Sequence, residues 1–126
     1  MKVRKFIKED ADDRRDIFAA IHTVPQTKRD MVFYVKRQAV LGNHYHKTFQ
    51  ENFLLVQGSA TLRTQRVNKA GQPLGRRKQI QIQAPCVITM PTYTAYAFRF
   101  SGPGVMVCRI TRRIYDEKDI NEFFLI

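Results

Sequence analysis

The segment from Gly42 to Gly58, GNHYHKTFQENFLLVQG, limits the fold more than any other part of the chain. Successive side chains of a β-strand point to opposite faces, so His44 and His46 project in the same direction. Glu51 then opens an apolar run with strand character. Because a hairpin between the two strands brings this carboxylate back beside the imidazoles, we expect the three side chains to share one cavity.

The spacing of these residues resembles the first motif of the cupin superfamily, in which His-x-His is followed by Glu and then by Gly. The family's usual earlier glycine is replaced by Gln38, and Gly42 lies nearer the first histidine. The resemblance implies a cupin double-stranded β-helix, a jelly-roll barrel. A succession of short apolar strands separated by turns is typical of the same all-β class.

The rest of the pattern predicts one domain over residues 1–126 with short helical segments near both ends. Residues 10–21 and 116–124 carry apolar side chains at helical spacing, while strands are expected at 31–35, 53–57, 60–67, 78–83, 86–90, 96–100 and 105–111. The turn-rich stretch 68–75 predicts a protruding, mobile loop that ends in a solvated Arg76–Lys78 cluster.

The second cupin motif, Pro-x-Gly-x-x-His, corresponds here to residues 91–96, PTYTAY. Tyr93 replaces the glycine, and Tyr96 replaces the histidine that would complete a metal site. His44, His46 and Glu51 could still hold a divalent metal such as Zn, Fe, Mn or Ni in a facial arrangement. The sequence leaves metal-bound and metal-free sites equally open.

A metal-free site of this composition suits proton transfer next to a ketone. His44 or His46 would act as the base and Tyr96 or Tyr93 as the acid, because imidazole titrates near neutrality and a phenol can return a proton. The remaining histidine would donate to the enolate oxygen that develops.

The run GNHYHK at residues 42–47 and the tail YDEKDI at 115–120 resemble the sugar 3,4-ketoisomerases and the cupin domain of capsular-polysaccharide enzymes. This resemblance implies an isomerase or epimerase of nucleotide-linked keto-sugars, with His44 and His46 catalytic. Gln50 stands where that family places its glutamate. A metal-dependent oxygenase or hydrolase and a non-enzymatic module that binds anionic ligands are the alternatives.

The net charge of +11 and the pI near 10.1 favour an anionic ligand such as a nucleotide-sugar. Arg37, Arg63 and Arg109 on strands, together with Tyr93, are the predicted substrate contacts. The basic residues are scattered and no recognition element is visible, which favours a solvated basic surface over a nucleic-acid groove.

The remaining expectations concern surroundings and partners. Cys86 and Cys108 lie in apolar runs and are expected to be buried thiols without a disulfide. No run has the length of a signal peptide or membrane span, so a cytoplasmic protein without membrane association is expected. Residues 53–56 are apolar on both strand faces, which predicts a homodimer that covers the outer one.

Overall fold

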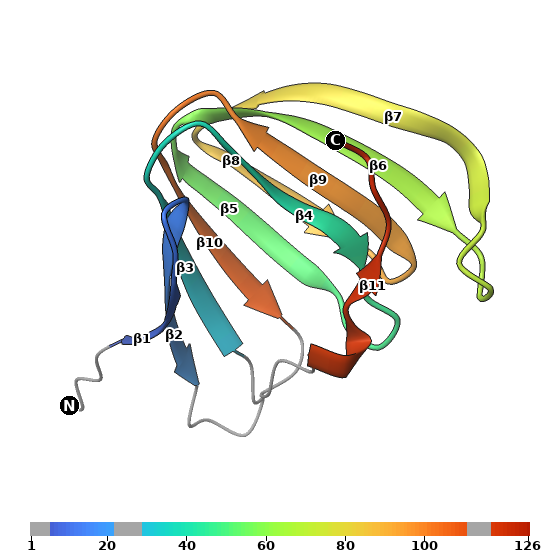
Figure 1. Cartoon of the computed structure of the whole chain (residues 1–126), viewed down its shortest axis with the longest axis horizontal. Coiled ribbons are helices and arrows are strands. Elements are labelled where there is room, and N and C mark those ends of the chain that lie inside the picture. Colours follow the sequence, from blue (N-terminus) through green and yellow to red (C-terminus); the bar gives the residue numbers. More distant parts are fainter. Residues whose placement is uncertain (1–5, 22–28, 111–116) are drawn as a thin grey trace.

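The computed structural model describes residues 6–21, 29–110 and 117–126, which form two antiparallel sheets facing each other (Figure 1). One sheet has the order β1 (Ile7–Ala11), β2 (Arg15–Ile21), β3 (Arg29–Val35), β10 (Gly104–Ile110), β5 (Glu51–Gln57) and β8 (Cys86–Met90). The other has the order β11 (Asn121–Glu122), β4 (Ala39–Tyr45), β9 (Thr94–Phe100), β6 (Ser59–Val67) and β7 (Pro73–Gln83). The predicted all-β cupin jelly-roll is confirmed.

Strand alternation fills the space between the sheets with large apolar side chains. Phe53 on β5 and Phe98 on β9 are almost fully buried, and their rings meet edge to face at 5.0 Å. Each such side chain contributes roughly 1.5–3 kcal/mol when it leaves water, and edge-to-face contact adds to this. Cys86 and Cys108 are free thiols within this β framework. The aromatic core therefore sets the separation of the two sheets around the polar residues at one end.

The predicted helical segments are wrong within the described residues. Residues 7–21 form the β1–β2 hairpin, whose turn is fixed because Asp12 Oδ1 accepts the N–H groups of Arg14 and Arg15. Pairing of β2 with β3 outweighs the local helical spacing. At the other end a single 3-10 turn, Glu117–Asp119, leads into β11, while residues 111–116 lie outside the described part. No described helix is long and apolar enough to cross a membrane.

The loop predicted at 68–75 is shorter than expected. A turn occupies residues 68–72, and β7 begins at Pro73. The Arg76–Lys78 cluster consequently lies on a paired strand rather than on a loop, and Figure 1 shows β7 curving along the edge of its sheet.

A bulge in β4 aims the first histidine of the motif. The pairing of β4 with β9 shifts register between Gly42 and His44, and Gly42 and Asn43 both have positive φ angles, of 106° and 60°. A Cβ atom on Gly42 would lie 2.6 Å from the carbonyl oxygen of Tyr96. Only glycine combines this φ with this close approach, so the bulge depends on it.

The outer face of the six-stranded sheet is apolar along a line that crosses five strands. The residues of this line are in register and are hereafter the outer apolar row: Phe18, Val32, Val107, Leu54 and Val87. Leu54 is 40% exposed and Val87 68% exposed in the single chain. The exposed row is where the predicted second subunit would pack.

Candidate active site

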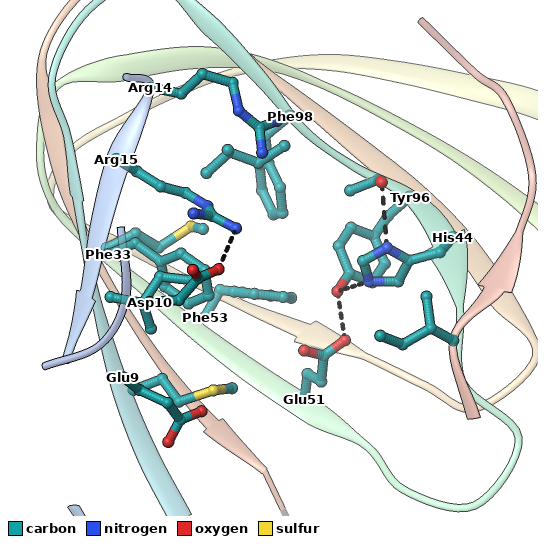
Figure 2. Close-up of a pocket in the computed structure, with 16 residues that line it drawn as sticks. Glu9, Asp10, Arg14, Arg15, Phe33, His44, Glu51, Phe53, Tyr96 and Phe98 are labelled. Carbon is teal, nitrogen blue, oxygen red and sulfur yellow. Dashed lines mark hydrogen bonds and ion pairs between the residues drawn. The ribbon is translucent and has the colours of Figure 1, made fainter. Parts of the chain in front are cut away.

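A cavity of about 640 Å³ lies between the two sheets. Figure 2 shows His44, Tyr96 and Glu51 together at one end and Arg15 with Asp10 at the other. The walls between these polar ends are apolar and come from both sheets: Ile17, Met31, Phe33, Leu41, Phe53, Phe98 and Met106. The cavity has the size of a typical small-molecule site and a few converging polar groups, which makes it the candidate active site.

Glu51 is the hub of the polar end. Its Oε1 atom accepts a 2.6 Å hydrogen bond from the Tyr96 phenol and lies 3.2 Å from His46 Nε2. Its Oε2 atom accepts a 3.3 Å hydrogen bond from the Cys108 thiol, whose pKa is raised by burial and by the nearby carboxylate, so the thiol stays protonated. The Tyr96 oxygen also lies 3.1 Å from His44 Nε2. One carboxylate thus links both predicted histidines and the tyrosine of the second motif.

Backbone carbonyls fix the orientation of both imidazoles. His44 Nδ1 lies 3.1 Å from the Gly42 carbonyl oxygen, and His46 Nδ1 lies 2.8 Å from that of Asp119. A carbonyl oxygen only accepts, so each Nδ1 carries a proton and donates. Both Nε2 atoms therefore turn toward the polar end of the cavity, one facing Tyr96 and the other Glu51.

At the polar end of the cavity, the number of short contacts between side chains exceeds the number of protons that can bridge them. The three contacts are His44 Nε2 with Tyr96, Tyr96 with Glu51, and Glu51 with His46 Nε2. The phenol supplies one proton, and a protonated His46 supplies a second. A third proton or a cation would complete the set, so the arrangement is suited to moving protons or to holding a metal.

Burial and charge push the pKa values of the two histidines apart. Burial, together with the neighbouring His46, lowers the pKa of His44 to about 4 against an opposing effect of Glu51. For His46 burial also acts to lower the pKa, but the hydrogen bond and charge of Glu51, aided by Asp119, outweigh it and raise the pKa above 6.5. His44 is consequently the neutral imidazole at pH 7, whereas the carboxylate of Glu51 favours the charged form of His46.

The C-terminal turn holds the second histidine in place. The Asp119 carboxylate accepts bonds from the backbone N–H groups of Lys47 and Thr48, from the Thr48 hydroxyl at 2.6 Å and from the Asn121 amide. These donors outweigh burial and lower the pKa of Asp119. Because the backbone carbonyl of Asp119 also binds His46, the C-terminal turn clamps the first motif. The sequence pattern did not reveal this clamp.

The comparisons with known proteins agree with this geometry. A family model described as the polysaccharide biosynthesis C-terminal domain matches residues 10–123. The chain belongs to this family. No curated protein sequence matches the chain.

Among solved structures, this polysaccharide biosynthesis C-terminal domain is similar to the capsular polysaccharide assembling protein CapF from Staphylococcus aureus. The TM-score is 0.80 at 21% identity, over 98% of this chain and 35% of that chain. The oxalate decarboxylase of Lactobacillus farciminis, solved as a formate complex, gives a TM-score of 0.69 at 17% identity, over 88% of this chain and 32% of that chain. Both likenesses show the fold, and the domain spans about a third of either chain.

The donor set of the domain fits a divalent cation. One ligand atom each from His44, His46 and Glu51 lies within 4.8 Å of the others. Zinc binds imidazole nitrogen and carboxylate oxygen at about 2.0–2.2 Å, so modest contraction would bring the three atoms around one ion. Ligand histidines usually donate their other N–H to a carbonyl or carboxylate, as both imidazoles do here.

The predicted substrate contacts of the domain lie away from the cavity. The structure brings together His44, Tyr96 and Glu51 on its wall. His46 contacts Glu51 and stacks on Phe49. The remaining four lie elsewhere: Arg37 pairs with Asp13, Arg63 binds Gln79 and the Leu125 carbonyl, Arg109 pairs with Asp30, and Tyr93 lies near Tyr45.

Among the described residues, the basic side chains that do line the cavity are those of Arg14 and Arg15 in the β1–β2 hairpin. Arg15 is mostly buried, with 14% of its side chain exposed, and pairs with Asp10 at 3.3 Å (Figure 2). It also pairs with Asp12 at 3.2 Å. Sequence reasoning missed these residues because the segment was interpreted as a helix, which would have turned them elsewhere.

Proposed function

We propose that this domain is a keto-sugar isomerase that acts on a nucleotide-linked substrate. The observation that carries the proposal is the run of short polar contacts from His44 through Tyr96 to Glu51 on the wall of a cavity of sugar-accommodating size. A neutral imidazole beside a phenol and a carboxylate provides the groups for removing and returning protons next to a carbonyl.

The reaction would move two protons by one position each. His44 Nε2 removes the proton from the carbon next to the ketone, and the C–H electron pair forms the enolate double bond. Tyr96 protonates the former ketone oxygen while Glu51 receives the proton of the neighbouring hydroxyl. His44 then returns its proton to the former ketone carbon, so the ketone and the hydroxyl exchange places and no oxidant is needed.

The arrangement of the groups favours isomerisation over epimerisation. His44 Nε2 and the Tyr96 oxygen are 3.1 Å apart on the same wall, so both approach one face of a bound sugar ring. Inversion at a single carbon needs a donor on the opposite face. There the cavity presents Arg15 and Asp10, which are paired with each other.

The comparisons support a sugar substrate. The family is one of polysaccharide biosynthesis, and CapF is a capsular polysaccharide assembling protein. The net charge of +11 favours an anionic carrier such as a nucleoside diphosphate.

A metal-dependent cupin reaction, of the oxygenase or hydrolase type, is the second candidate, because one ligand atom each of His44, His46 and Glu51 lies within 4.8 Å of the others. A divalent cation held by His44, His46 and Glu51 would supply Lewis-acid polarisation of a bound oxygen. The same polarisation would also assist the isomerase reaction, so metal content alone does not separate the two candidates.

The test follows deuterium from solvent into dTDP-linked and UDP-linked 4-keto-sugars by NMR. Wild-type protein should introduce deuterium next to the ketone and form the isomer, and His44→Gln should slow both by about 10²-fold or more. Asp13→Asn, an exposed change outside the cavity, is the matched control and should behave as wild type.

Metal analysis of the same preparations and dialysis against a chelator complete the design. Equal rates for wild type and His44→Gln, or no exchange with any keto-sugar, would exclude the isomerase. A stoichiometric metal together with oxygen-dependent or hydrolytic turnover would favour the second candidate.

A further inference from the structure

The acidic and basic residues of the chain are separated along the sequence. Residues 52–115 contain no Asp or Glu, and all 11 acidic residues lie outside this stretch. Seven basic residues of the stretch belong to β6, β7, β9 or the turn that joins β6 to β7: Arg63, Arg66, Lys69, Arg76, Arg77, Lys78 and Arg99. This half of the five-stranded sheet therefore carries positive charge without any carboxylate of its own.

Three of these cations face one groove of about 550 Å³. Arg66, Arg76 and Lys78 line it together with Thr64 and Thr94. Thr64 carries a further hydroxyl donor, whereas the Thr94 hydroxyl donates to the carbonyl oxygen of Thr92. The groove thus gathers guanidinium, ammonium and hydroxyl donors in one concave surface.

A bulge in β7 produces this arrangement. Thr64 pairs with Lys78 but Arg66 pairs with Leu74, so β7 has two more residues than β6 between these partners. The Gln65 amide fixes the bulge by donating to the carbonyl oxygens of Leu74 and Gly75 at 3.1 and 3.2 Å. The basic side chains are held on a fixed strand and not on a loose loop.

The groove is distinct from the candidate active site. Within the part of the chain that the structure describes, the two have no lining residue in common. Tyr96, Thr64 and Lys78 are successive partners across β9, β6 and β7. Two strand spacings, about 10 Å, therefore separate the phenol-bearing strand from Lys78. Arg66 lies on the intervening β6 and pairs with Thr94, two residues before Tyr96 on β9.

We propose that this groove binds the diphosphate group of a small molecule. Like charges that share a groove repel one another, and a bound anion relieves that repulsion. Two arginines offer forked N–H pairs that match phosphate oxygens, and a lysine adds a third charge. A diphosphate has enough oxygens and charge to engage all three cations at once. This inference does not depend on the isomerase reaction.

The test is calorimetric titration with pyrophosphate and with UDP in low-salt buffer. The groove variant Arg76→Gln/Lys78→Gln should weaken both dissociation constants by about tenfold or more, because charge-assisted bonds are lost. The matched control is Arg77→Gln/Arg99→Gln, which removes the same charge from β7 and β9 outside the groove. It should change the constants by less than about threefold.

Each result decides the matter. The proposal is supported if the groove variant loses binding while the control and His44→Gln retain it. UDP binding more tightly than pyrophosphate would identify a nucleotide as the source of the diphosphate. Absence of binding to wild-type protein, equal weakening in both double variants, or loss in His44→Gln would overturn the proposal. Melting temperatures of all variants show whether each is folded.

Discussion

Tyr96 and Glu51 belong to different sheets, yet the phenol of Tyr96 donates a 2.6 Å hydrogen bond to Glu51 Oε1. The bond crosses the sandwich at the polar end of the cavity, where both residues are buried. It ties β9 to β5 and places the phenol within 3.1 Å of His44. The tyrosine that replaces a motif histidine is therefore part of the site and not a vestige.

Removal of the Tyr96 hydroxyl should separate its chemical and structural roles. Tyr96→Phe should slow keto-sugar isomerisation by about 10²–10⁴-fold, because a proton carrier is lost. It should also lower the free energy of unfolding by about 1–3 kcal/mol, since the buried Glu51 loses a donor. Urea denaturation and the NMR assay measure the two effects. Tyr34→Phe, which removes an exposed phenol, should change neither; unaltered turnover in Tyr96→Phe would rule out its role as the acid.

Restoring the motif histidine should strengthen metal binding. In Tyr96→His a neutral imidazole replaces a phenol, which is a poor ligand unless it loses its proton. We expect the zinc dissociation constant of chelator-treated protein to fall by about tenfold or more. Competition with a colorimetric chelator measures it. His44→Gln/Tyr96→His should lose the gain, and an unchanged constant in Tyr96→His would mean that this position does not face the donor set.

The low pKa of His44 predicts how stability depends on pH. A histidine whose pKa falls from 6.5 to about 4 on folding binds fewer protons in the native state than in the unfolded state. The contribution of His44 to the free energy of unfolding is therefore fully present above pH 6.5 and decreases as the pH falls toward 4. Between pH 7 and 4.5 this loss amounts to about 2–3 kcal/mol. The raised pKa of His46 acts in the opposite sense: its contribution is present below pH 6.5 and disappears at higher pH.

The measurement compares urea denaturation of chelator-treated wild type and His44→Gln at pH 7 and pH 4.5. The variant should lack most of the loss, because its neutral amide does not titrate. Asp119, whose pKa is lowered from 3.8, affects stability only below this window. Parallel pH profiles for the two proteins would show that His44 is not buried in its neutral form.

The cupin fold and most of the metal-type donor set could be predicted from sequence because both depend on local spacing. His44, His46 and Glu51 follow from strand alternation and one hairpin, and Tyr96 follows from a motif position. The structure confirms their proximity. Local spacing could not predict which imidazole faces the cavity. That orientation depends on the bulge at Gly42 and on the carbonyl of Asp119.

The helical segments were mispredicted for a physical reason, and the same reason explains why the predicted arginines lie away from the cavity. Ile17 is spaced like a helical residue, but its strand gains more by pairing with β3, and only that pairing carries Arg15 to the cavity. Arg109, chosen because it lies on a strand, faces outward and pairs with Asp30. Strand alternation shows that two faces exist, while the packing of the sheets determines which one is inside.

The clamp formed by Asp119 should be costly to remove. Asp119→Ala leaves the N–H groups of Lys47 and Thr48 without their carboxylate, so the free energy of unfolding should fall by about 2–4 kcal/mol. Turnover should fall as well, because His46 loses its fixed orientation. Asp13→Ala removes a carboxylate from an exposed pair with Arg37 and should have no measurable effect on stability. Similar small changes in both variants would show that the C-terminal turn does not hold the motif.

The outer apolar row should mediate the homodimer predicted from the sequence. A two-fold axis near Val107, the centre of the row, would place the aromatic end at Phe18 against the aliphatic end at Val87 of a second copy. The neighbouring Arg109–Asp30 pair is neutral, which lets two chains of charge +11 approach over this face.

Sedimentation at micromolar concentrations should give about twice the chain mass of 14.8 kDa for wild type. Leu54→Glu should give the mass of one chain, because a carboxylate buried without a partner costs several kcal/mol. Ile80→Glu makes the same change on β7 of the other sheet, where Ile80 is 58% exposed, and should remain dimeric. A wild-type monomer, or a Leu54→Glu dimer, would show that the row does not join two copies.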